Sequence, residues 1–330
     1  MKFIAFNVRS DEEKYFKAWE KQSDVQVECV AAPLTTEKLD GLAGYDAVLT
    51  LQTGTYPEKM FEKFKEVGVK VLSIRNVGVD NIDLKAATEN GILVTNVPAY
   101  SPNAIAEFSV TQLLQLLRNT TLFRRRVAAH DFRWAPFVGK ELRSLTVGVL
   151  GTGRIGRAAI NIYRGFGAKV IAYDLYPNPE LKKEGIYVDS YAELFAQADV
   201  ITLHMPATAA DHHLIGAEAI AQMKDGVYLI NTARGALVDT EALIAGIKNG
   251  KIAGAALDTY ENESPIFNHD LKDQPLKDTV FKELLELDNV LITPHVAFYT
   301  ETAVENMVTI ALKSAQEAVT KGTTATLVNQ

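Results

Sequence analysis

The chain has 330 residues, of which 47% are hydrophobic, and it carries a formal net charge of −7 at pH 7. This length predicts about two domains, and the negative charge argues against nucleic acid or anionic lipid as a main partner. No apolar run approaches the roughly 18 residues of a membrane span, and no signal-peptide pattern opens the chain, so we expect a cytoplasmic protein without a membrane partner.

Five short β-branched runs, separated by helical or loop segments, make up the first hundred residues. They span residues 3–8, 25–30, 47–51, 69–74 and 92–96. Alternation of this kind is typical of a parallel sheet with helical crossovers. Cys29, the only cysteine, lies in the second run, where a buried core residue is favoured over a nucleophile. A single cysteine also excludes intramolecular disulfides and thiolate metal clusters.

A long helix is predicted to begin at Ser101-Pro102, because serine suits the N-cap and proline the first helical position. Its body, residues 105–117, is apolar on most faces, so we expect burial between domains or against a second subunit. We place the domain boundary here. A further helical stretch, residues 120–132, carries three consecutive arginines, 124–126. These arginines indicate a solvated helix face or an interface contact.

The most informative motif spans residues 147–156, an apolar strand followed by Gly151-Thr-Gly153-Arg-Ile-Gly156. Gly151 permits a tight turn, Gly153 lets the backbone approach a pyrophosphate, and Gly156 allows the helix to pack closely on the strand. The anion would bind at the N-terminus of that helix. Asp174, 18 residues after Gly156, would accept hydrogen bonds from a ribose 2′-hydroxyl, which favours NAD over NADP.

Strand and helix continue to alternate after this motif. Strands are predicted at residues 147–150, 170–173, 200–203, 227–230, 253–257 and 290–292, and a final helix at 300–319. Six strands match a complete doubly wound dinucleotide domain. Because the glycine motif begins near residue 150, the preceding α/β segment indicates a separate domain. The final helix is compatible with either domain.

Three polar residues follow predicted strands, at the edge where open parallel sheets bind ligands. Arg234 offers a planar fork of donors for a carboxylate, with a surface ion pair as the alternative. Glu263 alone is more often a loop acid, and His295 alone a structural histidine. Together they supply a cation for the substrate, a proton donor, and a carboxylate that keeps this donor charged near neutrality.

The other five histidines fit this role less well. His204 ends a strand and is expected to contact the cofactor, whereas His130 lies in the arginine-rich helix and His269 in a polar loop. His212 and His213 form an adjacent pair with no third ligand nearby in the sequence. Neither H-x-x-x-H nor H-E-x-x-H spacing occurs, so no metal site is predicted.

Four segments together resemble the successive signatures of the D-2-hydroxyacid dehydrogenase family. They are Gly151–Gly156, Asn231–Asp239, Asp258–Glu263 and Thr293–Tyr299. The resemblance extends over essentially the whole chain. Within the family, residues 73–83, 96–107 and 130–136 are similar to the bacterial D-lactate and D-hydroxyisocaproate dehydrogenases.

The resemblance implies NAD-dependent reduction of 2-oxo acids to D-2-hydroxy acids. Arg234 would bind the substrate carboxylate and polarise the carbonyl, His295 would protonate the carbonyl oxygen, and Glu263 would hydrogen-bond the imidazole. The backbone N–H groups of Val77 and Gly78 would share the carboxylate. The family pattern also gives two residues that would close the substrate pocket, Tyr100 and Phe298.

The resemblance further implies two doubly wound parallel-sheet domains with a cleft between them, where hydride transfer would occur and closure would exclude water. Residues 102–298 would form a Rossmann-type NAD-binding domain, and residues 1–101 and 299–330 a flavodoxin-like substrate domain. A homodimer would form through the NAD domain, with a contribution from residues 105–117. The cofactor-binding set would be Gly151, Gly153, Arg154, Ile155, Gly156, Asp174, His204, Met205, Pro206, Asp211, Thr232, Ala233 and Asp258.

Two positions depart from the family pattern. Leu51 stands where lactate-preferring relatives commonly have tyrosine, which indicates a wider apolar slot for bulkier 2-oxo acids such as phenylpyruvate or 2-oxoisocaproate. Asp211 stands where relatives often have asparagine near the cofactor.

Two other classes of protein are alternatives to a D-2-hydroxyacid dehydrogenase. An L-hydroxyacid dehydrogenase would place the glycine motif near residue 25, which the order here opposes. An NAD-sensing corepressor scaffold of the same fold is the second alternative. The joint presence of Arg234, Glu263 and His295 favours catalysis over that scaffold.

Overall fold

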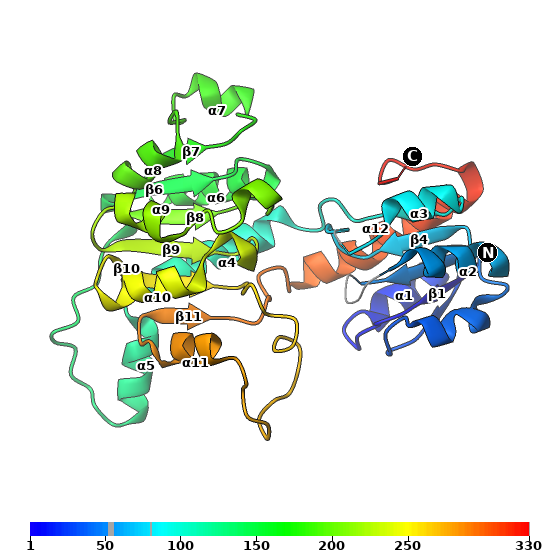
Figure 1. Cartoon of the computed structure of the whole chain (residues 1–330), viewed down its shortest axis with the longest axis horizontal. Coiled ribbons are helices and arrows are strands. Elements are labelled where there is room, and N and C mark those ends of the chain that lie inside the picture. Colours follow the sequence, from blue (N-terminus) through cyan, green and yellow to red (C-terminus); the bar gives the residue numbers. More distant parts are fainter. Residues whose placement is uncertain (52–55, 80, 330) are drawn as a thin grey trace. The chain divides into compact units, whose positions relative to one another are not determined.

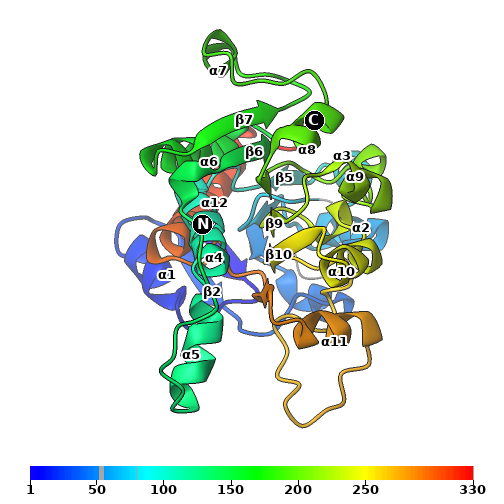
Figure 2. The same cartoon turned by 90° about the vertical axis from the view of Figure 1, so that its left-hand side faces the viewer.

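The computed structural model describes residues 1–51, 56–79 and 81–329, which divide into two compact units. Unit 1 consists of Met1–Ser101 together with Tyr299–Gln330, and unit 2 of Pro102–Phe298. Each unit contains one sheet with helices on both faces (Figures 1 and 2). Among the described residues, none of the helices combines the length and apolar character that a membrane crossing requires.

The sheet of unit 1 has five parallel strands in the order β2-β1-β3-β4-β5. Its last strand is extended by the end of the chain, since the Val94 N–H donates to Asn329 Oδ1 at 2.6 Å and Thr95 bridges to Leu327. The strands are β1 (Lys2–Ala5), β2 (Gln26–Cys29), β3 (Ala47–Thr50), β4 (Val71–Ile74) and β5 (Leu93–Thr95).

Alternate side chains of these strands enter two separate cores, because successive residues of a strand point to opposite faces. Phe3 and Ala5 face α1 (Glu13–Glu20) and α12 (Glu301–Lys321). Ile4 faces the other core, which is formed with the 3₁₀ helix η1 (Thr36–Leu42), α2 (Glu58–Val67) and α3 (Leu84–Glu89). The final helix therefore packs on the sheet of unit 1.

The sheet of unit 2 has six parallel strands in the order β11-β10-β9-β8-β6-β7. The order reverses at β6, which lies between β7 and β8. Such a reversal is the switch point at which doubly wound sheets bind ligands. The strands are β6 (Thr146–Leu150), β7 (Lys169–Tyr173), β8 (Val200–Leu203), β9 (Val227–Asn231), β10 (Ile252–Leu257) and β11 (Val290–Ile292).

Helices cover both faces of this sheet as well. One face packs against α4 (Pro102–Leu117) and α6 (Arg154–Gly165). The other packs against α8 (Tyr191–Gln197), α9 (Ala217–Gln222), α10 (Thr240–Lys248) and α11 (Thr279–Glu286). Each fully buried Leu, Ile or Val side chain in these layers contributes about 1.5–3 kcal/mol. The remaining helices are α5 (Thr120–Ala128) and α7 (Pro179–Lys183), with the 3₁₀ helices η2 (Leu142–Ser144), η3 (Ala209–Asp211) and η4 (Gly235–Leu237).

The predicted burial of the long helix is confirmed, with partners in its own unit. Helix α4 contacts α6 and strands β9 and β10, and Val110, Leu113 and Leu117 are buried there. The sequence pattern predicts a partner in another domain or subunit, and the elements that pack on the helix within the described chain belong to its own unit. The sequence pattern showed that the helix is apolar on most faces, but it carried no information on which element covers them.

Two local expectations were wrong. Cys29 is exposed rather than buried, because it lies on β2, the edge strand of the unit 1 sheet. Partial burial of its thiol still raises the pKa of Cys29 to about 11, which keeps it protonated. The arginine-rich helix ends at Ala128 rather than Phe132, because His130 has φ of 59° and so leaves the helical conformation.

Candidate active site

The glycine loop joins β6 to α6, and two of its glycines are required by packing. Gly151 has φ of 90°, and a Cβ there would lie 2.5 Å from the carbonyl oxygen of His204. A Cβ on Gly156 would lie 2.0 Å from the carbonyl oxygen of Gly151. At Gly153 a Cβ would meet no described atom within 4 Å. The space beside Gly153, at the N-terminus of α6, therefore suits an approaching phosphate.

Asp174 is held beside this loop at the end of β7. Its Oδ2 accepts hydrogen bonds from the Thr152 N–H at 2.6 Å and the Thr152 hydroxyl at 2.9 Å. Its Oδ1 accepts from the Tyr176 N–H at 2.8 Å. These donors orient the carboxylate and leave lone pairs on both oxygens, which suits acceptance from a pair of ribose hydroxyls.

Two of the six buried polar side-chain atoms that have no hydrogen-bond partner among the described residues follow the neighbouring strands β8 and β9. They are Nδ1 of His204, after β8, and Oγ1 of Thr232, after β9. Burial lowers the pKa of His204 to about 4, so its ring is neutral near pH 7. Its Nε2 already bonds the Thr202 hydroxyl at 2.9 Å. Buried polar groups normally have partners, so these two atoms suit a polar ligand.

His295 and Glu263 are in direct contact. Nδ1 of His295 lies 2.7 Å from Oε1 of Glu263, and both side chains are partly exposed. The other carboxylate oxygen, Oε2, accepts the Tyr260 N–H at 2.9 Å. A carboxylate at this distance fixes the ring so that Nδ1 carries a proton, which leaves Nε2 for proton exchange with a substrate.

The turn that carries His295 is held by Asp258, whose structural role the sequence did not reveal. His295 has φ of 56°, an unfavourable conformation for a residue with a side chain. The Asp258 side chain, only 1% exposed, accepts hydrogen bonds from the Thr293 hydroxyl and from the N–H groups of Val296 and Ala297, at 2.6–2.9 Å. Its carbonyl oxygen accepts the His295 N–H at 2.9 Å. Burial raises the pKa of Asp258, and these donors oppose that shift.

Arg234 is exposed at the end of β9. Its Nη1 donates to the Ala233 carbonyl at 2.8 Å, and its own carbonyl accepts from the Asn231 side chain at 2.8 Å. Among residues 1–51, 56–79 and 81–329, no carboxylate lies within ion-pair distance of the guanidinium. The alternative of a surface ion pair therefore finds no support in the described chain, and the guanidinium remains available to an anionic ligand.

The three strand-end residues lie at one edge of the sheet. They follow β9, β10 and β11, which are consecutive neighbours and parallel. The first two loops touch directly, because a Cβ on Gly235 would lie 2.1 Å from the Tyr260 carbonyl carbon. This edge thus presents a cation and a carboxylate-bound imidazole.

In unit 1, the turn containing Val77 and Gly78 is fixed by two asparagine side chains. The Asn96 amide donates to the Val77 carbonyl at 2.7 Å and the Asn76 amide to the Gly78 carbonyl at 3.1 Å. Val77 is exposed. Tyr100 is half-buried, and its carbonyl accepts from Asn306 of α12 at 2.6 Å.

The remaining predicted site residues are distributed over both units. Leu51 ends the described segment after β3, and its carbonyl accepts from the Tyr56 hydroxyl at 2.9 Å. Asp211 closes η3, is 8% exposed and accepts from the Thr208 hydroxyl at 2.5 Å. The others lie at the start of α6 (Arg154, Ile155), after β8 (Met205, Pro206), after β9 (Ala233) and at the end of unit 2 (Phe298).

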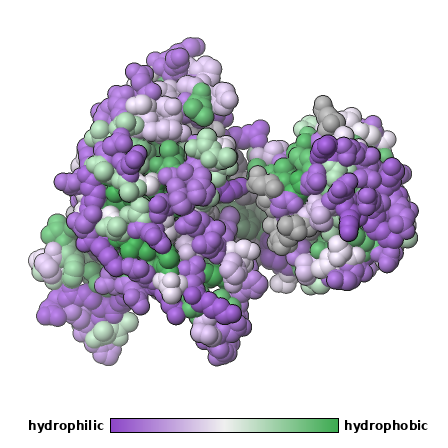
Figure 3. Space-filling view, in the orientation of Figure 1, coloured by the Kyte–Doolittle hydropathy of each residue, from purple (hydrophilic) through white to green (hydrophobic). Residues whose placement is uncertain are grey.

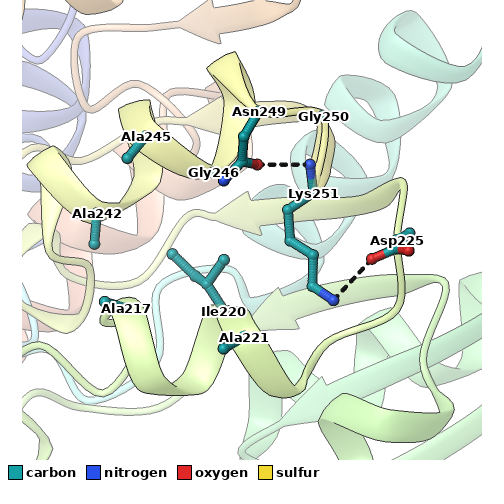
Figure 4. A pocket seen from close by; sticks show the side chains of 10 residues that line it. All are labelled: Ala217, Ile220, Ala221, Asp225, Ala242, Ala245, Gly246, Asn249, Gly250 and Lys251. Atoms are coloured by element: carbon teal, nitrogen blue, oxygen red, sulfur yellow. Dashed lines mark hydrogen bonds and ion pairs between the residues drawn. The ribbon is translucent and has the colours of Figure 1, made fainter.

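A separate pocket of about 530 Å³ lies between α9 and α10 (Figure 4). Small side chains, including Ala217, Ala242 and Gly246, line much of it. At its rim, Lys251 pairs with Asp225 at 2.8 Å. It contains none of the predicted site residues, so we do not assign it to the active site.

The glycine loop, the acid after β7 and the polar strand ends define a dinucleotide-binding α/β protein. A family model described as D-isomer specific 2-hydroxyacid dehydrogenase, NAD binding domain, matches residues 110–297. A D-lactate dehydrogenase of Lactiplantibacillus plantarum is 55% identical over 323 residues, which cover 98% of this chain and 97% of the relative.

Solved structures of D-2-hydroxyacid dehydrogenases are also similar to this chain. A D-2-hydroxyisocaproate dehydrogenase is 45% identical and superposes with a TM-score of 0.93, covering 100% of both chains. The NAD-complexed D-isomer specific 2-hydroxyacid dehydrogenase of Lactobacillus delbrueckii ssp. bulgaricus is 40% identical, with a TM-score of 0.87 and 100% of both chains covered.

The chain therefore belongs to the D-isomer specific 2-hydroxyacid dehydrogenase family. It is an NAD-dependent oxidoreductase, as the sequence predicted, rather than a scaffold without turnover. The open space at Gly153 and the unpartnered atoms of His204 and Thr232 fit the cofactor that this family uses.

Proposed function

We propose that the chain reduces 2-oxo acids to D-2-hydroxy acids, with unit 2 binding NADH and unit 1 supplying most of the substrate-binding residues. The observation that carries this proposal is the 2.7 Å contact between His295 and Glu263 at the edge that also bears the unpaired Arg234. NADH, when bound, supplies the hydride. The side chains and backbone of the protein bind and orient the substrate and supply the proton.

Arg234 binds the substrate. Its planar guanidinium offers parallel N–H donors to the carboxylate, and a further donor to the neighbouring carbonyl oxygen. The N–H groups of Val77 and Gly78 share the carboxylate. Polarisation of the carbonyl by Arg234 favours the negative charge that develops on its oxygen during reduction.

His295 supplies the proton. In reduction, its Nε2–H donates to the carbonyl oxygen and the N–H bond breaks as the new O–H bond forms. Nδ1 keeps its own proton throughout and uses it to form the hydrogen bond to Glu263. In the oxidation direction, the neutral Nε2 accepts the hydroxyl proton. Asp258 acts through the turn that it holds, and is a positioning residue.

The cofactor is held by the residues around the glycine loop. The pyrophosphate approaches the N–H groups of Arg154 and Ile155 beside Gly153. Asp174 accepts from the ribose hydroxyls, and its charge disfavours a 2′-phosphate. Polar strand-end atoms and the loop after β8 complete the set, namely His204, Met205, Pro206, Asp211, Thr232, Ala233 and Asp258.

We further propose that Leu51, with Tyr100 and Phe298, forms an apolar pocket that accepts bulky 2-oxo acids. Leu51 lacks the hydroxyl that tyrosine would place there, so it costs less to bury a branched or aromatic substrate side chain beside it. The similarity to a D-2-hydroxyisocaproate dehydrogenase supports this proposal, whereas the D-lactate dehydrogenase relative represents the competing preference.

A substrate panel tests both proposals. Loss of NADH absorbance is measured with pyruvate, 2-oxoisocaproate and phenylpyruvate, and kcat/KM is compared. We expect the two bulkier acids to be reduced at least as well as pyruvate, and Leu51→Tyr to shift the ratio towards pyruvate. A parent enzyme with pyruvate far ahead would refute the bulky-substrate proposal, and no turnover with any acid would refute the reaction itself.

We also propose that the chain forms a homodimer through unit 2. Helix α5 and the segment after it project from the unit 2 sheet (Figures 1 and 2), and α5 contains no buried residue. Large apolar side chains are exposed there: Phe132 is 73% exposed, Trp134 79% and Val138 90%. The face drawn in Figure 3 shows mostly hydrophilic side chains, with hydrophobic ones scattered between them. Clustered exposed apolar residues typically mark an interface.

A further inference from the structure

The fold brings together three metal-ligating side chains that are far apart in the sequence. His212 and His213 follow η3, and Glu261 lies in the loop after β10. One nitrogen of each histidine and one oxygen of Glu261 lie within 4.8 Å of one another. The two rings stack with centroids 3.9 Å apart. The third ligand, which the local sequence lacks, is supplied by the neighbouring loop.

The spacing of these atoms is close to that of a metal site. Nε2 of His213 and Oε2 of Glu261 are 2.9 Å apart. Ligands at the usual zinc bond lengths of about 2.0–2.1 Å in a tetrahedral site lie roughly 3.3 Å from one another. A small outward movement of Glu261 and rotation of the exposed His212 ring would meet this requirement. The His212 ring stacks on His213, and no hydrogen bond joins it to a described residue.

The residues that would orient the ligands are also in place. Oδ2 of Asp239 lies 3.8 Å from Nδ1 of His213, the ring nitrogen that would not bind the metal. The Thr240 hydroxyl donates to Glu261 Oε1 at 2.8 Å, which leaves Oε2 for the metal. In natural metal sites a hydrogen bond such as that of Thr240 sets the direction of a ligating carboxylate. An acid at hydrogen-bond distance sets the tautomer of a ligating histidine, and Asp239 would need to move closer to Nδ1 to do so.

Hydrogen bonds fix the backbone around His213 and at the start of α10, which carries Asp239 at its N-cap. The His213 N–H donates to the Ala236 carbonyl at 2.8 Å, and Asp239 caps α10 by accepting the Ala242 N–H at 3.0 Å. His213 is 34% exposed and Glu261 23%, so an ion can enter from solvent and retain water. Two imidazoles, one carboxylate and an open position constitute a ligand set that suits zinc.

We propose that His212, His213 and Glu261 form a binding site for one divalent transition ion, with Zn²⁺ as the representative. The ion would join the loop after η3 to the loop after β10. None of Arg234, Glu263 and His295 is among its ligands. The family reaction does not need it, so occupancy is tested by binding rather than by turnover.

Zinc binding by the chelator-treated full chain is measured by isothermal titration calorimetry, with NADH absent. We expect one equivalent per chain. His212→Ala should weaken binding at least about tenfold, because loss even of a residue that only orients a ligand typically costs 10–100-fold in metal affinity. His269→Ala, which removes another exposed histidine of unit 2, is the matched control and should bind as the parent does.

Thermal unfolding gives an independent readout. Stoichiometric Zn²⁺ should raise the Tm of the parent and of His269→Ala, because a ligand that binds the folded state stabilises it, and should raise that of His212→Ala by clearly less. Since His212 is exposed, this variant should fold, and its Tm without metal verifies that. Equal affinity in the parent and His212→Ala, or no saturable binding by the parent, would overturn the proposal.

Discussion

At the scale of single residues, His295, which we propose as the proton donor, illustrates how many supporting contacts one side chain can have. The ring of His295 has one dedicated partner, Glu263, and its backbone has another, Asp258. The unfavourable φ of 56° persists because the surrounding turn is held by several hydrogen bonds to one buried carboxylate. Substitutions that remove a single contact therefore have separable effects on charge and on position.

Replacing Glu263 by glutamine removes the negative charge 2.7 Å from His295 Nδ1. The carboxylate accepts the Nδ1–H of His295, which directs Nε2 towards the substrate, whereas a glutamine amide can turn an N–H towards Nδ1 and no longer specifies that tautomer. Glu263→Gln should therefore lower kcat for a 2-oxo acid by at least about tenfold. Steady-state kinetics with saturating NADH measure this loss. Glu241→Gln, an exposed position on α10, should keep the kcat of the parent, and an equally unchanged kcat in Glu263→Gln would remove Glu263 from the mechanism.

His204 makes stability depend on pH. Burial lowers its pKa from 6.5 to about 4 in the folded chain, so between these values the unfolded chain binds a proton that the folded chain does not. Its contribution to stability is complete above pH 6.5 and is lost as the pH falls towards 4. Between pH 7 and pH 5, the parent should lose about 2 kcal/mol more unfolding free energy than His204→Gln.

Urea unfolding followed by circular dichroism at the two pH values measures this difference. Each protein is compared with itself, so any general destabilisation by the substitution cancels. An identical decline in parent and variant would show that the His204 ring is not buried in the neutral form.

At the scale of elements, two glycines of the β6–α6 loop have different roles: Gly156 is required for helix packing, and Gly153 leaves space for the cofactor. A Cβ on Gly156 would meet backbone at 2.0 Å, whereas one on Gly153 would meet nothing within 4 Å. Gly156→Ala should therefore lower the Tm, because the α6 helix must move away from β6. Gly153→Ala should leave the Tm near that of the parent and raise the KM for NADH, because the methyl group occupies the path of the pyrophosphate.

Differential scanning fluorimetry without cofactor and NADH titrations at saturating substrate distinguish the two effects. Each variant serves as the control for the other. A Gly156→Ala protein as stable as the parent would contradict the close approach of α6 to β6.

Most elements could be predicted from periodicity, and their ends depended on single residues. Strands β8 and β11 span the predicted residues, while β1 ends at Ala5 rather than Val8, where Asn7 turns the chain with φ of 54°. The positions of Arg234, Glu263 and His295 could be predicted because each follows a strand of a parallel sheet. Neither the turn held by Asp258 nor the contact of His213 with Glu261 could be, because tertiary pairing alone brings these partners together.

At the scale of the whole molecule, the exposed apolar side chains after α5 predict self-association. Sedimentation velocity should show a dimer for the parent. A double variant, Trp134→Ser with Val138→Ser, should sediment as a monomer at the same concentration, because burial of these two side chains would no longer favour association. Phe166→Ser, which changes a side chain of unit 2 that is 47% exposed, should remain dimeric. A monomeric parent would contradict the proposed dimer.

Unit 1 draws on both ends of the chain, and this has a consequence for biosynthesis. Its five strands leave the ribosome first, but α12, which covers one face of the sheet with Val308, Ala311 and Leu312, is made only after all of unit 2. Domains generally fold in the order of synthesis, yet here the first sheet must wait with the part of one apolar face that α1 does not cover still exposed. Unit 2 can therefore fold before unit 1 is complete, and the nascent chain is most in need of chaperone protection along β3, β4 and β5, the strands that α12 contacts.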